Sequence, residues 1–139
     1  MSVLQDPQGP DWPLGNIVVV APGTPVSIMS LVDPSSFADP STATGSVAGV
    51  PEYTRRCQQI IFQGVKDAVS GLQNNTGNVY IVRKGGSKDD AGSIVMVLQA
   101  GQTFFLASAP AVKDVFSPYR YYIDADNAAD GAQVTLLIF

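Results

Sequence analysis

Residues 119–139, YRYYIDADNAADGAQVTLLIF, hold two alternating stretches of sequence on either side of a polar turn. Apolar or aromatic side chains occupy every second position over 119–123 and again over 134–138. A period of two residues is typical of a β-strand that buries one face. Residues 126–131, DNAADG, combine the Asp, Asn and Gly that favour tight turns. The stretch therefore predicts two strands joined by a turn, and similar strand signals recur along the chain.

Other strands are predicted where β-branched or aromatic residues cluster, at 16–21, 26–32, 56–63, 78–84, 93–99 and 102–108. Ala100 and Gly101 separate the last two by the spacing of a tight β-hairpin, so we expect these two strands to pair. Residues 65–72 predict one helical turn or a bulged connection. No stretch predicts a long amphipathic helix. The whole pattern indicates an all-β protein, an antiparallel β-sandwich that is jelly-roll-like.

The 139 residues divide into a predicted arm and one predicted domain. Residues 1–15 hold three prolines, and proline lacks the amide hydrogen that strands and helices need. We therefore expect an extended N-terminal arm over 1–15 and a single β-sandwich domain over 16–139. Within that domain, residues 33–50 are rich in Pro, Ser, Ala, Thr and Gly and predict a long loop.

Five residues are predicted to contact other proteins, namely Trp12, Leu14, Phe37, Arg120 and Tyr122. The first two belong to the arm, which lies either against its own domain or against a neighbouring subunit. Phe37 belongs to the long loop, whereas Arg120 and Tyr122 lie on the strand face opposite Tyr121. Aromatic residues and Arg are enriched in protein interfaces and sugar-binding platforms, and they are also ordinary strand residues.

Charged residues are scarce, at 14% of the chain against the roughly 25% that is usual. Few charges are left to keep bare surface soluble, so a partner is expected to cover part of it. The net charge is −4 and the only basic pairs are Arg55-Arg56 and Arg83-Lys84, so nucleic acid is not expected as a partner. No apolar run is long enough to span a membrane and no signal peptide is recognised, so synthesis in a cytoplasm is expected.

The residues that most enzymes use are missing or badly spaced. The sequence has no histidine, which removes His-dependent nucleophile pairs, histidine metal sites and the usual general base near neutral pH. Residues 85–88, GGSK, lack the spacing of a phosphate-binding loop. Cys57 is the only cysteine, so no internal disulfide is expected. We expect no enzymatic activity and no cofactor.

The acidic turn from Asp124 to Asp130 could offer oxygens to a calcium ion. An EF-hand loop that begins at Asp124 needs a ligand at 128 and glycine at 129, and both are alanine. A loop that begins at Asp126 fails because Ala128 takes the place of its third-position ligand. We therefore expect no metal but a turn, in which Asp side chains accept hydrogen bonds from backbone amides and Gly131 takes positive φ.

Four segments of residues 58–139 carry a likeness to a known family, namely QQIIFQ, NNTGNVYIVRKGG, GSIVMVLQAGQTFFL and YRYYIDADNAADGAQVTLLIF. They comprise a Gly-Asn-Val-Tyr-Ile strand after a turn, an apolar-Gly-Gln-Thr-Phe hairpin, and an aromatic-Ile-Asp-Ala-Asp segment before a final apolar strand. In these traits the chain resembles small virion proteins of tailed bacteriophages, above all the jelly-roll cement, or decoration, proteins that sit on phage heads.

The resemblance implies a β-sandwich on the capsid exterior that oligomerises, with a homodimer favoured, and bridges subunits of the major capsid protein. The arm and the long loop are then the segments that reach neighbouring subunits, and Tyr122 or the edge strands lie at the self-interface. The alternative is a carbohydrate-binding β-sandwich of a phage head or tail fibre, which would show coplanar exposed aromatics beside carboxylates. A small β-barrel enzyme is disfavoured by the missing histidine.

Overall fold

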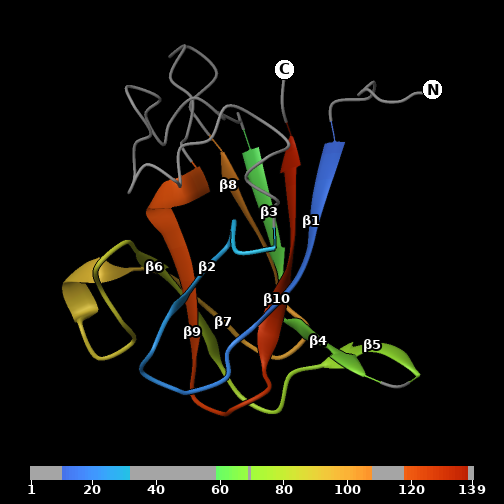
Figure 1. The fold of residues 1–139 in the computed structure, drawn as a ribbon, viewed down its shortest axis with the longest axis horizontal. Coiled ribbons are helices and arrows are strands. Elements are labelled where there is room, and N and C mark those ends of the chain that lie inside the picture. The colour runs from blue at the N-terminus through green and yellow to red at the C-terminus, as the bar shows by residue number, and fades with distance from the viewer. Residues whose placement is uncertain (1–10, 32–58, 69, 108–117, 138–139) are drawn as a thin grey trace.

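The computed structural model describes residues 11–31, 59–68, 70–107 and 118–137. Two four-stranded antiparallel sheets make up most of this part of the chain (Figure 1). The first sheet contains, in spatial order, β1 (Asp11–Val18), β10 (Gly131–Leu137), β3 (Gln59–Gln63) and β8 (Thr103–Ala107). The second sheet contains β2 (Val26–Ser27), β9 (Tyr121–Ala125), β6 (Val79–Arg83) and β7 (Ile94–Leu98).

A smaller hairpin and two short 3-10 turns complete the described structure. The hairpin strands β4 (Val65–Ala68) and β5 (Gly71–Asn74) pair with each other and project sideways near one end of the sheets (Figure 1). The 3-10 turns η3 (Ala91–Ser93) and η4 (Pro118–Arg120) precede β7 and β9. No described segment forms a helix that is long and apolar enough to cross a membrane.

Side chains from both sheets fill one core between them. Phe62 and Leu136 point inward from the first sheet, Ile81 and Ile123 point inward from the second, and all four are fully buried. Each such side chain contributes on the order of 1.5–3 kcal/mol to folding through the apolar surface it removes from water. The expected all-β, antiparallel β-sandwich is therefore confirmed.

The chain changes sheet at nearly every step. From β1 to β10, successive strands of the sandwich lie in opposite sheets, except for the β6–β7 pair, and the β4–β5 hairpin stands apart from both sheets. Strands that are far apart in the sequence therefore become neighbours, as β10 does by pairing with β1 on one side and β3 on the other.

The predicted boundary between arm and domain at residue 15 is wrong. Strand β1 begins at Asp11 and pairs with β10 along its length, so the sheet includes residues that the prolines had assigned to the arm. Pro13 is tolerated because β1 is an edge strand, where a missing amide hydrogen costs no ladder bond. Residues 1–10, together with the predicted loop at 33–50, lie outside the described residues.

Two further predictions of local structure are corrected. The strand expected over 26–32 is only β2, because the Ser27 hydroxyl accepts a hydrogen bond from the Met29 amide and the Ser27 carbonyl accepts one from the Ser30 amide, which turns the chain. The helical turn or bulge expected over 65–72 is instead the β4–β5 hairpin, in which Ala68 pairs with Gly71.

The hairpin predicted between 93–99 and 102–108 is also wrong, although both of its strands exist. Strand β7 pairs with β6 and strand β8 pairs with β3, so the tight turn between them joins the two sheets. Gly64 decides this outcome, because its amide donates to the Gln102 carbonyl at 2.8 Å and its carbonyl accepts from the Gly101 amide at 2.8 Å. The turn's polar groups thereby bond to the end of β3 rather than extend a hairpin ladder.

The core packing predicts the effect of a matched pair of leucine truncations. Leu136 is fully buried, so Leu136→Ala should lower the free energy of unfolding by about 2–5 kcal/mol through lost burial and a residual cavity. Leu72 on β5 is 52% exposed, so Leu72→Ala should change it by about 0.5 kcal/mol or less. Urea denaturation followed by fluorescence measures both values, and equal losses would contradict the described core.

Candidate interaction surface

Part of the outer face of the second sheet is covered by the chain's own loops. Ile81 and Ile123 point into the core, so their strand neighbours Val82 and Asp124 point outward. Both outward residues are nevertheless fully buried. The segments around residues 21–24 and 84–93 therefore lie over this face, and their amides bond to Asp124.

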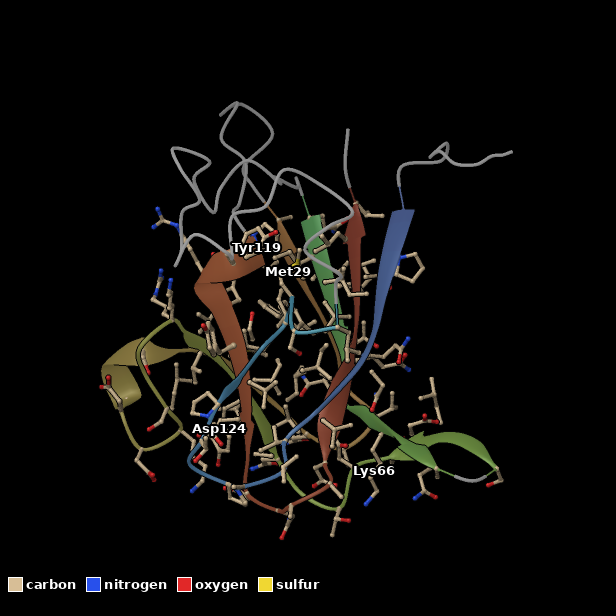
Figure 2. All side chains as sticks on the ribbon, in the orientation of Figure 1. Met29, Lys66, Tyr119 and Asp124 are labelled. Carbon is tan, nitrogen blue, oxygen red and sulfur yellow. The ribbon has the colours of Figure 1, made fainter. Side chains whose placement is uncertain are left out.

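The Asp124 carboxylate holds both covering segments in place (Figure 2). Its Oδ1 accepts hydrogen bonds from the amides of Gly23 and Ala125, each at 2.8 Å, and its Oδ2 accepts one from the Lys88 amide at 2.9 Å. A buried carboxylate is costly unless its oxygens are bonded, and three amide donors offset that cost here. Asp124 is therefore a structural residue that helps to hold two loop segments over part of this face.

Replacement of Asp124 by its amide tests this role. In Asp124→Asn, one oxygen becomes an NH₂ group that must face an amide donor, so the free energy of unfolding should fall by about 1–3 kcal/mol. Urea denaturation measures the loss. The exposed Asp89→Asn is the control and should leave the midpoint unchanged, because its ion pair with Lys88 lies at the surface. An unchanged midpoint in Asp124→Asn would show that the covering segments do not depend on the carboxylate.

The outer face of the first sheet is open by contrast. Its outward residues form three rows that cross β8, β3, β10 and β1 in that order. The middle row is Phe105, Ile61, Thr135 and Pro13. The rows on either side of it are Ala107, Gln59, Leu137 and Asp11, and Thr103, Gln63, Gln133 and Asn16. Leaving aside Asp11, whose side chain is not described, every one of these side chains is exposed or half-exposed. We call these three rows the open face.

The open face carries almost no charge. Asp11 is the only charged residue in the three rows, and it stands at the start of edge strand β1. Phe105 is 56% exposed and lies next to Ile61, which gives the middle row an apolar end. A surface of this kind can be covered by another protein without removing charges from water, and the removal of charges is costly in an interface.

A second buried carboxylate, Asp130, joins several segments near the base of the β4–β5 hairpin. Its Oδ1 accepts a hydrogen bond from the Thr76 amide and its Oδ2 accepts one from the Gly77 amide, each at 2.9 Å. The Lys66 ammonium group (Figure 2) lies 3.2 Å from Oδ1, and the Asp130 carbonyl accepts from the Val19 amide at 2.9 Å. Asp130 thus connects β4, the end of β1 and the two turns before β6 and β10.

The turn that carries Asp130 is held by Asn75 as well. The Asn75 Nδ2 donates to the Gly131 carbonyl at 2.8 Å, and the Gly131 amide donates to the Asn75 Oδ1 at 3.0 Å. The predicted turn with amide-capping aspartates is confirmed, but positive φ belongs to Ala129 at 73° and not to Gly131. Glycine is needed at 131 because a Cβ there would collide with the Ile17 carbonyl oxygen.

The bonds to Asp130 predict a pH dependence of stability. Burial raises the pKa of Asp130, but the amides of Thr76 and Gly77 and the Lys66 ammonium outweigh it and hold the pKa below its ordinary value of 3.8. A carboxylate with a lowered folded pKa adds stability above its unfolded pKa, and that stability is lost as the pH falls through the folded pKa. Asp130→Asn should therefore be less stable than the wild type at neutral pH by about 1–3 kcal/mol, with the difference narrowing below about pH 4.

Urea denaturation of both proteins across this pH range measures the difference. Asp67→Asn is the control, since Asp67 is exposed on the same hairpin and should show a small difference throughout. A difference for Asp130→Asn that stays constant down to strong acid would contradict the role assigned to its charge.

Among the described residues, no group of three or more His, Cys, Asp or Glu side chains is arranged to hold a metal ion. Asp124 and Asp130, the ends of the acidic turn, direct their oxygens at backbone amides of other loops. These two carboxylates therefore stabilise the loops around the turn.

The arm residues predicted as contacts fall in different places. Leu14 is 7% exposed and belongs to the core, so its prediction as an arm contact is wrong. The register of β1 shifts between Pro13 and Gly15, and Leu14 is the extra residue at this bulge. Trp12 lies in β1 opposite Leu136. Phe37 lies outside the described residues.

The two other predicted contacts are not on the open face. Arg120 is exposed in η4, and Tyr122 is half-exposed on the outer side of the second sheet, where it pairs with Ser27 and Val82. Sequence reasoning missed Phe105, which the structure places at the edge of the open face. The available signal was the complete lack of charge over residues 93–108.

Comparison with known proteins identifies no relative of this chain. No protein-family model matches it, and neither a curated protein nor a solved structure does. The fold and the two differently covered faces are therefore the basis for a functional proposal, together with the sequence traits described above.

Proposed function

We propose that this protein is a structural virion protein that binds the outer surface of a phage capsid and stabilises it by bridging subunits of the major capsid protein. The observation that carries the proposal is the open face, which is exposed or half-exposed and, apart from Asp11, uncharged. A bridging protein needs a stiff surface that its partner can cover without a large desolvation cost, and this face has that property.

The fold supports the same proposal. We infer that the sandwich is a jelly roll, a fold of eight strands in two sheets formed by two Greek keys. The orders β1-β10-β3-β8 and β2-β9-β6-β7, with β4–β5 as an insertion, support this inference because each sheet pairs an early strand with a late one. The phage cement proteins that residues 58–139 resemble are also jelly rolls.

The two faces of the sandwich suit different environments. The face of the second sheet that Asp124 and its two loop segments partly cover would remain toward solvent. The open face would lie against capsid subunits, and the projecting β4–β5 hairpin, with the exposed Leu72, offers a second contact. The protein would act on the virion exterior as a homo-oligomer after synthesis in the host cytoplasm.

The alternative proposal, a carbohydrate-binding module, fits the described residues less well. Such a module would combine exposed aromatic rings with flanking carboxylates. Among the described aromatics, Phe105 is the one that is mostly exposed, and no acidic residue shares its row. Tyr80 does lie beside a carboxylate, but its hydroxyl is already bonded to Asp126 at 3.0 Å.

A charge placed in the open face tests the capsid proposal. Thr135 is half-exposed in the middle row, between Ile61 and Pro13, so Thr135→Lys should leave the fold intact and bury an unpaired charge on binding. We expect it to weaken attachment to capsids on the order of a hundredfold. Co-sedimentation of purified protein with particles that lack it measures the affinity, and cryo-EM of the particles locates the bound protein.

The matched control is Ala91→Lys, which adds the same charge to an exposed position in η3 on the covered side. It should attach like the wild type. Failure of the wild-type protein to bind capsids would refute the proposal, as would equal binding by the Thr135→Lys variant. Binding to a glycan array by the isolated protein would instead favour the carbohydrate module.

A further inference from the structure

Three of the four edges of the two four-stranded sheets carry features that prevent pairing with another strand. Edge strand β1 contains Pro13 and a bulge before Gly15. Edge strand β2 is two residues long. Edge strand β7 is bulged where its register against β6 shifts between Ile81 and Val82. Prolines, short strands and bulges are the usual means by which proteins keep sheet edges from pairing.

The fourth edge, β8, has none of these features. Its sequence TFFLA contains no proline and no charged residue, and it pairs with β3 without a register shift. Phe105, at the centre of the strand, is 56% exposed. No strand of the described residues pairs with the side of β8 that faces away from β3, so this side presents a regular row of backbone N–H and C=O groups to a further strand.

We propose that β8 pairs in antiparallel fashion with β8 of a second copy of this chain, with Phe105 opposite Phe105 across a two-fold axis. The first sheets of both copies then form one continuous sheet. In this register Thr103 lies opposite Ala107, and Phe104 lies opposite Leu106. Outward residues meet outward residues and inward residues meet inward residues, as a two-sided sheet requires.

The charge pattern favours a second copy as the occupant. Because β8 has no charged residue, it offers nothing to attract an acidic or basic segment of another protein. Two copies that each carry a net charge of −4 repel one another most where their charged surfaces meet and least at an uncharged edge. A Phe105 pair adds a cross-strand aromatic contact, and a closed dimer leaves no β8 edge unpaired.

This inference deepens the proposed capsid function, since it names the contact by which the bridging protein would pair with itself. The two open faces would lie side by side on one sheet and double the surface available to the capsid. The test uses the free protein without capsids. A failure here would therefore leave attachment of single copies intact, and a failure of capsid binding would leave the dimer intact.

Substitutions of opposite charge at position 105 test whether β8 is the strand that pairs and whether Phe105 lies opposite its own copy. Phe105→Lys and Phe105→Glu should each raise the dimer dissociation constant by about thirtyfold or more, because the aromatic contact is replaced by like charges directly opposite one another. An equimolar mixture of the two variants should dimerise again, because Lys then lies opposite Glu. Sedimentation-velocity ultracentrifugation measures the molar mass in each case. The control is Leu72→Lys, which changes a similarly exposed residue on β5 and should dimerise like the wild type.

A wild-type protein that remains monomeric at about 100 µM, well above the dissociation constants of ordinary specific interfaces, would overturn the proposal. Full dimerisation of either single variant would do so as well, and so would a mixture that stays monomeric. Circular dichroism checks that the variants fold. Hydrogen exchange on the unmodified chain gives a second test, since amides of β8 should exchange more slowly as the protein concentration rises, and exchange independent of concentration would contradict the pairing.

Discussion

The Asp130 carboxylate is buried at the point where four segments of the chain meet. Amides of Thr76 and Gly77 and the Lys66 ammonium replace the water that the carboxylate loses. These bonds align the turn before β10 with the turn before β6, and β10 is the strand that pairs with both β1 and β3. These bonds to one buried carboxylate therefore help to hold β10 in its place between β1 and β3, and with it the first sheet that carries the open face.

Asp124 shows how the same chemistry makes the two faces of the sandwich different. The chain has few charges, and two of its aspartates are buried and accept hydrogen bonds from backbone amides. Asp124 draws two segments over the second sheet, whereas the outward residues of the first sheet include no buried carboxylate that could do the same. One face is consequently covered in part by the chain itself, and the other is the face that we propose a partner covers.

Both proposed contacts arise from the same scarcity of charge. The open face and edge strand β8 belong to one sheet, so a dimer through β8 would extend the surface that we propose for the capsid rather than compete with it. Regular backbone pairing would supply the contact between copies, and side chains such as Ile61 and Thr135 would supply the contact with capsid subunits. The proposed contact between copies would lie at the edge of the sheet, in its plane, whereas the proposed contact with the capsid would lie on the face of the sheet.

The sequence by itself determined strand β6, the alternating part of strand β10 and the turn at 126–131, because a period of two and turn residues act locally. It also determined that few charges would lie at the surface. Only the tertiary structure decided the pairing of β7 and β8, since a tight turn suits either a hairpin or a change of sheet until Gly64 bonds to it. The coverage of the faces was likewise decided by Asp124, whose amide partners lie in other loops that no local pattern connects.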